Sequence, residues 1–251
     1  MKERRHLIII GIFGCITYII ADLCYAFKDK NASTESLGLL IKVSYLKVYN
    51  WRISLSITLG FFATFLFYIG YHQMFKVLKK RLNDQNNKIY VKLFRISYIT
   101  GTVSFTFSHS IFMNVGFIFK FIYEKYGDLK IAADIANKVN YYNLMPMAIS
   151  LIACDFNLTV IMIILIWKKI IPLSSIWKRI FATLYNPLMS LCICGTILSY
   201  FPWPINQLKY GCQSFGYALV LYLGLILNDS MKVKQQFEEK KDILKKVNFE
   251  K

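Results

Sequence analysis

The chain has 251 residues, of which 56% are hydrophobic and only 18% are charged. Soluble domains usually have about a quarter charged residues and lack the apolar runs of about twenty residues that occur here. This composition excludes an ordinary soluble enzyme, a disordered protein and a small secreted disulfide domain. The formal charge of +17 lies almost entirely between the apolar runs. That placement suits contact with lipid headgroups, and it indicates no nucleic-acid partner.

Six apolar runs are long enough to cross about 30 Å of hydrocarbon as helices. They are Leu7–Phe27, Ile53–Phe75, Leu93–Phe119, Leu144–Trp167, Ile180–Tyr200 and Leu208–Asn228. All four tryptophans fall at the ends of these runs or between them, where indole rings prefer to lie in membranes. The sequence therefore predicts an all-α integral membrane protein, with a six-helix transmembrane domain over residues 1–228 and a charged cytoplasmic tail helix over 229–251.

The basic residues predict how the chain threads the membrane. If the N-terminus is inside, the cytoplasmic segments hold 21 of the 31 Lys and Arg residues and the outer segments hold the other 10. Basic residues are enriched on the cytoplasmic side, so both termini are expected in the cytoplasm of a multi-pass protein of the cell membrane. Anionic headgroups on that side are the expected partners of the basic loops and tail. A membrane-protein partner or a second copy of the chain remains an alternative.

Two outer connections have a helical pattern of apolar residues. Residues 33–48 begin with the capping candidates Ser33 and Thr34, and residues 128–142 begin with Asp128 as a cap. The apolar face of the first segment consists of Leu37, Leu40, Ile41, Tyr45 and Val48. Both segments are expected to form short amphipathic helices on the outer surface or over the mouth of the bundle, or else solvated helical loops. In the fifth run, Asn186–Pro187 predicts a kink.

Ionisable groups within the apolar runs are the main candidates for function, because they are costly in hydrocarbon unless paired or hydrated. Asp22 and His109 lie in the outer halves of the first and third runs, and Asp155 lies near the middle of the fourth. Arg52, at the outer start of the second run, could reach Asp22. We expect one polar pocket for a substrate or a proton. The alternative is separate structural pairs, such as Asp22 with Arg52. Further candidates for the pocket are Asn114, Asn157, Gln213 and Tyr217.

The sequence indicates neither a metal site nor a cofactor. His109 is the only histidine at membrane depth, and no zinc-binding or nucleotide-binding pattern occurs. The six cysteines all lie in the apolar runs, where cysteine mostly behaves as a small hydrophobic residue. A disulfide between Cys24 and Cys212, both near the outer side, is one possibility.

Three classes of function fit these features, and no motif assigns a reaction. A small-molecule or ion transporter, or a permease-type component of one, is favoured by the six spans and the carboxylates at membrane depth. A membrane-embedded enzyme acting on a lipid would use His109 and Asp155 as acid and base. An accessory or immunity-type protein would act through a partner in the membrane. Whether the chain is an enzyme stays open, although the scattered acid and base groups argue against it.

Overall fold

The computed structural model describes the chain from Arg5 to Phe249, apart from residues 29–30, 32, 34, 39–40, 83–87 and 185. The described residues form helices joined by loops, with no β-strand among them. The helices are α1 (Arg5–Ala26), α2 (Asn50–Arg81), α3 (Lys88–Tyr126), α4 (Leu129–Trp167), α5 (Ile176–Leu184), α6 (Pro187–Ser199) and α7 (Cys212–Phe249), with the 3₁₀ turns η1 (Val43–Lys47) and η3 (Ile205–Gly211).

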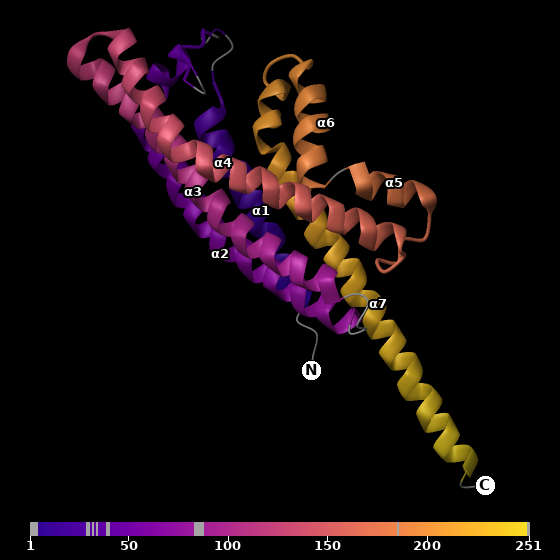
Figure 1. Ribbon diagram of the computed structural model, residues 1–251. Coiled ribbons are helices and arrows are strands. Elements are labelled where there is room, and N and C mark those ends of the chain that lie inside the picture. Colours follow the sequence, from indigo (N-terminus) through magenta and orange to yellow (C-terminus); the bar gives the residue numbers. More distant parts are fainter. Residues whose placement is uncertain are drawn as a thin grey trace.

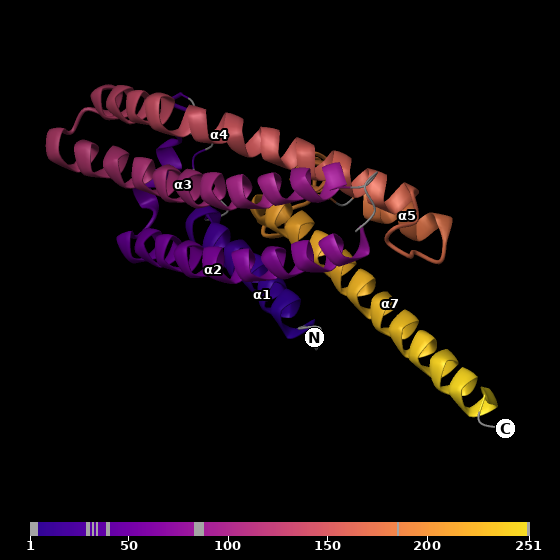
Figure 2. The ribbon, with the colours of Figure 1, turned by 60° about the horizontal axis from the view of Figure 1, so that its bottom comes forward.

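The long helices form two antiparallel pairs, α1 with α2 and α3 with α4, and α2 also packs against α3 (Figure 1). The first part of α7 packs against α1 and α6, and its second part extends well beyond the bundle (Figure 2). The pair α1–α2 crosses closely at two glycines, because a Cβ on Gly11 would lie 2.5 Å from the Cα of Gly70. Small residues at such a crossing allow two membrane helices to make close van der Waals contact.

Five helical segments are long and apolar enough to cross a membrane, and they coincide with five of the six predicted runs. Large apolar side chains are exposed along their outer faces, including Phe61, Phe62 and Phe65 on α2 and Ile149 on α4. A soluble surface would not expose so many apolar residues, whereas lipid tails solvate them. The fold is therefore an apolar helical bundle of the kind found in membrane proteins, with five helices long and apolar enough to span a membrane, or six if the bent pair α5–α6 counts as one.

The predicted fifth span is not one helix. The chain forms α5 and α6 instead, whose axes differ in direction by 82°. Asn186 precedes α6 as its cap, with its side-chain oxygen accepting a hydrogen bond from the Met189 amide at 3.1 Å. Pro187 is the first residue of α6, where its missing N–H costs nothing. The predicted kink at Asn186–Pro187 is therefore a complete break with a capped restart.

The first predicted loop helix, over residues 33–48, is not formed in the described part of that segment. Thr34 and Leu40 lie outside the described part. An isolated bridge joins Ser36 and Lys42, and only η1 is helical. The apolar residues Ile41, Tyr45 and Val48 are buried in a cluster with α3 and α4, for example against Phe119 and Ala136. Packing against the bundle therefore overrides the local helical periodicity of this segment.

The second predicted loop helix exists, but it is not a separate element. Residues 129–142 are the first turns of α4, which continues without interruption through Pro146 to Trp167. Asp128 caps this helix as predicted, because its Oδ1 accepts hydrogen bonds from the amides of Lys130 and Ile131 at 2.8 and 2.9 Å. At the other end of the chain, α7 continues into the predicted tail as one helix as far as Phe249, while residues 250–251 lie outside the described part.

Candidate functional site

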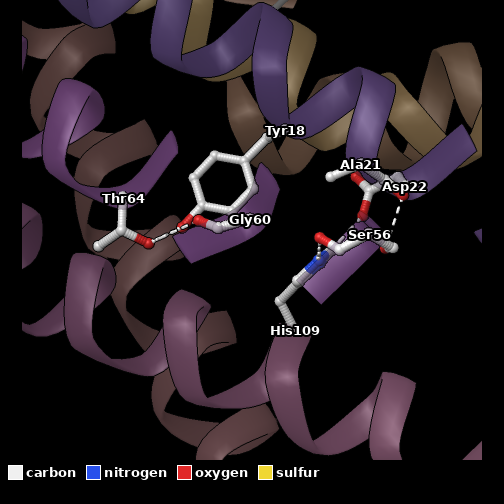
Figure 3. Close-up of polar contacts among 7 residues, drawn as sticks. All are labelled: Tyr18, Ala21, Asp22, Ser56, Gly60, Thr64 and His109. Carbon is white, nitrogen blue, oxygen red and sulfur yellow. Dashed lines mark hydrogen bonds and ion pairs between the residues drawn. The ribbon is translucent and has the colours of Figure 1, made fainter. Parts of the chain in front are cut away.

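Three helices meet at the imidazole ring of His109 on α3. Its Nδ1 lies 3.2 Å from Oδ1 of Asp22 on α1, and its Nε2 lies 3.2 Å from the backbone carbonyl oxygen of Ser56 on α2 (Figure 3). The side chains of His109 and Asp22 are only 5% and 18% exposed. The ring therefore connects α1, α2 and α3 at a buried position within the apolar runs.

The acceptors around His109 determine where its hydrogens lie. A carbonyl oxygen can only accept, so Nε2 must carry a hydrogen toward Ser56. A second hydrogen lies between Nδ1 and Asp22, giving either an imidazolium with a carboxylate or a neutral imidazole with a carboxylic acid. The net charge of the pair is zero in both forms. Loss of the shared proton would leave two acceptors facing each other and a net charge of −1.

The neighbouring residues on α2 make room for the ring and fix its surroundings. A Cβ on Gly60 would lie 2.4 Å from Cδ2 of His109, so only glycine fits at this position without displacing the ring. The hydroxyl of Ser56 donates to the carbonyl oxygen of Ala21 at 2.7 Å, which ties α2 to α1. On the other side, Tyr18 and Thr64 share a hydrogen bond between their hydroxyl groups (Figure 3).

The Asp22–His109 pair lies on the wall of a cavity of about 220 Å³. Its lining residues come from α1, α3, α4, η3 and α7, and they are Asp22, Tyr25, Ala26, Phe105, Ser108, His109, Phe112, Met113, Leu151, Tyr210 and Gln213. The hydroxyl oxygens of Tyr25 and Ser108 are buried and find no hydrogen-bond partner within the described part of the chain. Both oxygens are enclosed by protein atoms, and that of Tyr25 is packed against Gly116 on α3.

Asp155 on α4 lies behind this cavity and is 2% exposed. Gln213 on α7 donates to its Oδ2 at 2.6 Å, and the hydroxyl of Tyr217 donates to its Oδ1. The two donors are one turn apart on α7 and bind the two carboxylate oxygens separately. Gln213 also lines the cavity, so one side chain contacts both the cavity and the buried carboxylate.

Three predicted pocket residues have other surroundings. Asn157 donates to Oγ of Ser97 and thereby holds α4 against α3. Asn114 is exposed on α3 and does not line the cavity. Arg52 donates from Nε to the carbonyl oxygen of Cys24 at 2.7 Å and from Nη2 to that of Phe27.

The predicted pair of Asp22 with Arg52 is therefore wrong, because Asp22 binds His109 instead. The guanidinium group of Arg52 has another role at the end of α1. It satisfies carbonyl groups in the last turn of that helix and just beyond it, which lack partners within the helix. Arg52 thus anchors the start of α2 to the end of α1.

Sequence reasoning missed several residues around His109, among them Ser56, Gly60 and Thr64. These three small residues recur every four positions on α2, so they share one helical face. They form a stripe of small residues along that face. Its spacing was a usable signal that another helix, and with it a bulky side chain, approaches this face.

The 3₁₀ turn η1 lies next to the cavity and packs against two of its lining residues. The Tyr45 ring packs against the rings of Tyr25 and Phe112, with centroids 5.1 and 6.4 Å apart. The ammonium group of Lys28 lies 3.9 Å above the Tyr45 ring and donates to Oγ of Ser44 at 2.8 Å. Burial of this ammonium group and, second, the nearby charge of Lys42 lower the pKa of Lys28 to about 7.

The cysteines and the acidic groups form no further centre in the part of the chain that the structure describes. All six cysteines are free thiols, so Cys24 and Cys212 are not joined. No group of three or more His, Cys, Asp or Glu residues gathers within the described ranges. The chemistry available at the site is thus proton exchange and hydrogen bonding by Asp22, His109 and their neighbours.

The model of a family whose description reads "family of unknown function (DUF6796)" matches residues 1–230 of the chain. No curated protein and no solved structure matches it.

Proposed function

The chain belongs to the family of unknown function DUF6796, and because that membership brings no ligand or reaction with it, we propose a function from the cavity itself. The protein is a multi-pass membrane carrier that exchanges a small cation for the proton of the Asp22–His109 pair. The observation that carries this proposal is the position of that pair, which lies on the wall of a cavity that is also lined by aromatic rings.

The charge balance of the pair favours a cation as the ligand. Once the shared proton leaves to water, the Asp22 carboxylate faces the lone pair of Nδ1, and the site has a net charge of −1. An entering monovalent cation restores the net charge to zero, so proton and cation are bound in exchange. An uncompensated charge at this depth would be costly, which disfavours the empty deprotonated state.

The remaining cavity groups suit a cation as well. The aromatic rings of Tyr25, Phe105 and Phe112 line the cavity, and aromatic faces attract cations. The amide nitrogen of Gln213 is occupied by Asp155, which leaves its carbonyl oxygen as the group that can still accept. The volume of about 220 Å³ is below the range of ~300–1,000 Å³ typical of pockets for drug-sized molecules, so the ligand is small.

The alternative of a lipid-modifying enzyme is less well supported by the contacts of His109. A general base needs a ring nitrogen within reach of the substrate's proton, but both nitrogens of His109 already contact groups of the protein. The basic loops still predict that the cavity lies in the outer half of the cell membrane, with both termini in the cytoplasm. In that orientation the carrier would load its cation from outside.

Proton flux in proteoliposomes tests the proposal. The full chain is reconstituted with an internal pH indicator, the membrane potential is clamped with potassium and valinomycin, and sodium or tetramethylammonium chloride is added outside. Tetramethylammonium has no neutral form that could cross the bilayer unaided. We expect the external cation to raise the internal pH, because protons leave in exchange for it.

Two pairs of variants sharpen this experiment. Asp22→Asn should abolish the flux, whereas Asp229→Asn, which removes a carboxylate paired with Arg5 outside the cavity, should not. His109→Gln should flatten the dependence of the cation-driven flux on external pH. His72→Gln should leave that dependence unchanged, because His72 binds the Tyr98 hydroxyl and does not line the cavity. Absence of cation-driven flux, or equal flux in Asp22→Asn, would overturn the proposal.

A further inference from the structure

A second, larger hollow lies between α5 and α7, away from the Asp22–His109 cavity. Its volume is about 870 Å³, and its walls are mainly apolar side chains, such as Phe181 and Leu184 on α5 and Leu223 and Ile226 on α7. None of the residues of α5 is buried, and Phe181 is 52% exposed. Helix α5 therefore leaves an apolar groove between itself and α7 instead of packing against it.

The groove has a cationic rim. Lys178 lines it, and the described contact of its ammonium group is with a neutral partner, Oγ of Ser174, at 3.1 Å. Arg179 is the next residue of α5 and does not itself line the groove. It donates from Nη2 to the carbonyl oxygen of Leu173, a lining residue, at 3.3 Å, while its buried Nε finds no partner among the described residues. Both side chains thus retain charge or donor capacity that the described contacts do not use.

No acidic residue compensates this charge nearby in the sequence. The chain contains no Asp or Glu between Asp155 and Asp229. Asp155 is held by Gln213 and Tyr217, and Asp229 is paired with Arg5 at 3.7 Å. The rim of the groove is therefore complementary to an anion, whereas its interior is complementary to hydrocarbon.

We propose that this groove binds one anionic phospholipid, with an acyl chain between α5 and α7 and the headgroup phosphate at Lys178, beside which Arg179 lies in the sequence. A free phosphate would leave the apolar walls uncovered, and a purely apolar ligand would leave the two cations unpaired. Arg and Lys side chains form their strongest hydrogen bonds with phosphate and carboxylate groups. The short amphipathic helix α5, with basic and apolar residues, is also typical of helices that lie in the membrane interface.

This site is independent of the proposed cation exchange, because it shares no lining residue with the cavity at His109. It assigns a role to the break between α5 and α6. A straight fifth span would carry Phe181 and Leu184 in line with α6, whereas the bent chain places them opposite α7 and opens the groove. The break thus provides the second wall of a lipid site.

Photolabelling of the full chain in nanodiscs tests the proposal. Nanodiscs of phosphatidylcholine contain a trace of either phosphatidylglycerol or phosphatidylcholine with a diazirine in its acyl chain, and labelled peptides are identified by mass spectrometry. We expect the phosphatidylglycerol probe to label residues 219–226 several-fold more than the phosphatidylcholine probe. Each basic residue near a membrane surface contributes about a fivefold preference for an anionic lipid.

The variants separate the headgroup contact from the acyl-chain contact. Lys178→Gln, alone and combined with Arg179→Gln, should reduce phosphatidylglycerol labelling toward the level of phosphatidylcholine. The matched control is the pair Lys130→Gln and Lys138→Gln, which removes two exposed charges from α4. Ile226→Trp should narrow the groove and reduce labelling by both probes, whereas Ile149→Trp on the exposed face of α4 should not.

Two results would overturn the proposal. The first is equal labelling of residues 219–226 by the two probes in the unaltered chain, which would mean that the groove holds only bulk lipid. The second is a preference for phosphatidylglycerol that persists in Lys178→Gln and in the double variant. Because Lys178 is exposed and its described contact is with the nearby Ser174, the single variant is expected to fold normally and keeps the test decisive.

Discussion

Two opposing effects act on the protonation of the Lys28 ammonium group, which lies over the Tyr45 ring of η1. Burial and the charge of Lys42 disfavour its protonated form, whereas the Tyr45 ring beneath it favours a cation. The indole N–H of Trp203 also donates to the Lys28 carbonyl oxygen at 2.8 Å, so the backbone here is tied to the chain before η3. The protonation of one side chain is thus coupled to the contact between η1 and the end of α1.

Lys28 should make stability depend on pH in a defined direction. Its pKa is lowered from 10.5 to about 7 in the folded chain, so between these values the unfolded chain binds more protons than the folded one. The free energy of unfolding therefore rises with pH across this window. We expect the melting temperature of the wild-type chain, measured relative to that of Lys28→Met, to increase from pH 7 to pH 10. A difference that is constant with pH would show that Lys28 stays protonated.

The individual candidate residues illustrate what one sequence can and cannot predict. Position along an apolar run predicts a similar membrane depth for Asp22 and His109, and the two side chains are in contact. The rotation of one helix against another does not follow from depth. For this reason the sequence could not show that Arg52 faces the carbonyl groups of α1, or that Asn157 faces Ser97.

At the scale of elements, α4 and α7 are connected through Asp155. Its two oxygens bind donors from Gln213 and Tyr217, and Tyr217 is further held by the Tyr71 hydroxyl, which donates to its carbonyl oxygen at 3.0 Å. A buried carboxylate with two donors is thus the polar link between the two helices. Removing it leaves both donors without an acceptor in an apolar environment.

Two substitutions of Asp155 should therefore differ in their effect. Asp155→Leu leaves two buried donors unpaired and should lower the free energy of unfolding by about 2–4 kcal/mol. Asp155→Asn keeps one oxygen acceptor, and Gln213 can turn its amide so that its oxygen accepts from the new NH₂ group. Its cost should be about 1 kcal/mol or less. Thermal unfolding in detergent measures both, and equal losses would show that the charge, rather than the hydrogen bonds, matters.

The elements themselves were predictable to different degrees. Long apolar runs dictate helices in a membrane because all backbone groups must be satisfied within the segment, so α1 to α4 and α7 follow from composition. The break before α6 was only half predicted. Pro187 indicates a bend, but whether the chain kinks or restarts depends on the Asn186 cap. That cap is also fixed by the hydroxyl of Thr159 on α4, which donates to Oδ1 of Asn186 at 2.7 Å.

At the scale of the whole molecule, the bundle has two distinct ends. The turn from α3 to α4 lies at one end, and the start of α1, the end of α2 and the projecting part of α7 lie toward the other (Figure 1). The cavity with Asp22 lies toward the first end, because Asp22 is one turn before the end of α1. The basic residues predict that this first end is outside the cell.

Cysteine labelling tests this orientation. On a background without the six native cysteines, Lys138→Cys near the start of α4 should react with a membrane-impermeant maleimide in intact cells. Lys79→Cys, near the end of α2, should react only after permeabilisation. Both side chains are exposed, so accessibility within the protein does not limit either reaction. The reverse pattern of labelling would place the termini outside.

The continuity of α7 has a mechanical consequence. This helix is one rod of 38 residues, about 57 Å long at 1.5 Å per residue. Gln213 is its second residue, and the charged tail forms its far end. Hydrogen bonds continue along the whole helix, so a displacement of the tail would be passed along α7 toward the Gln213–Asp155 contact. The tail and this part of the cavity wall therefore belong to opposite ends of one continuous helix.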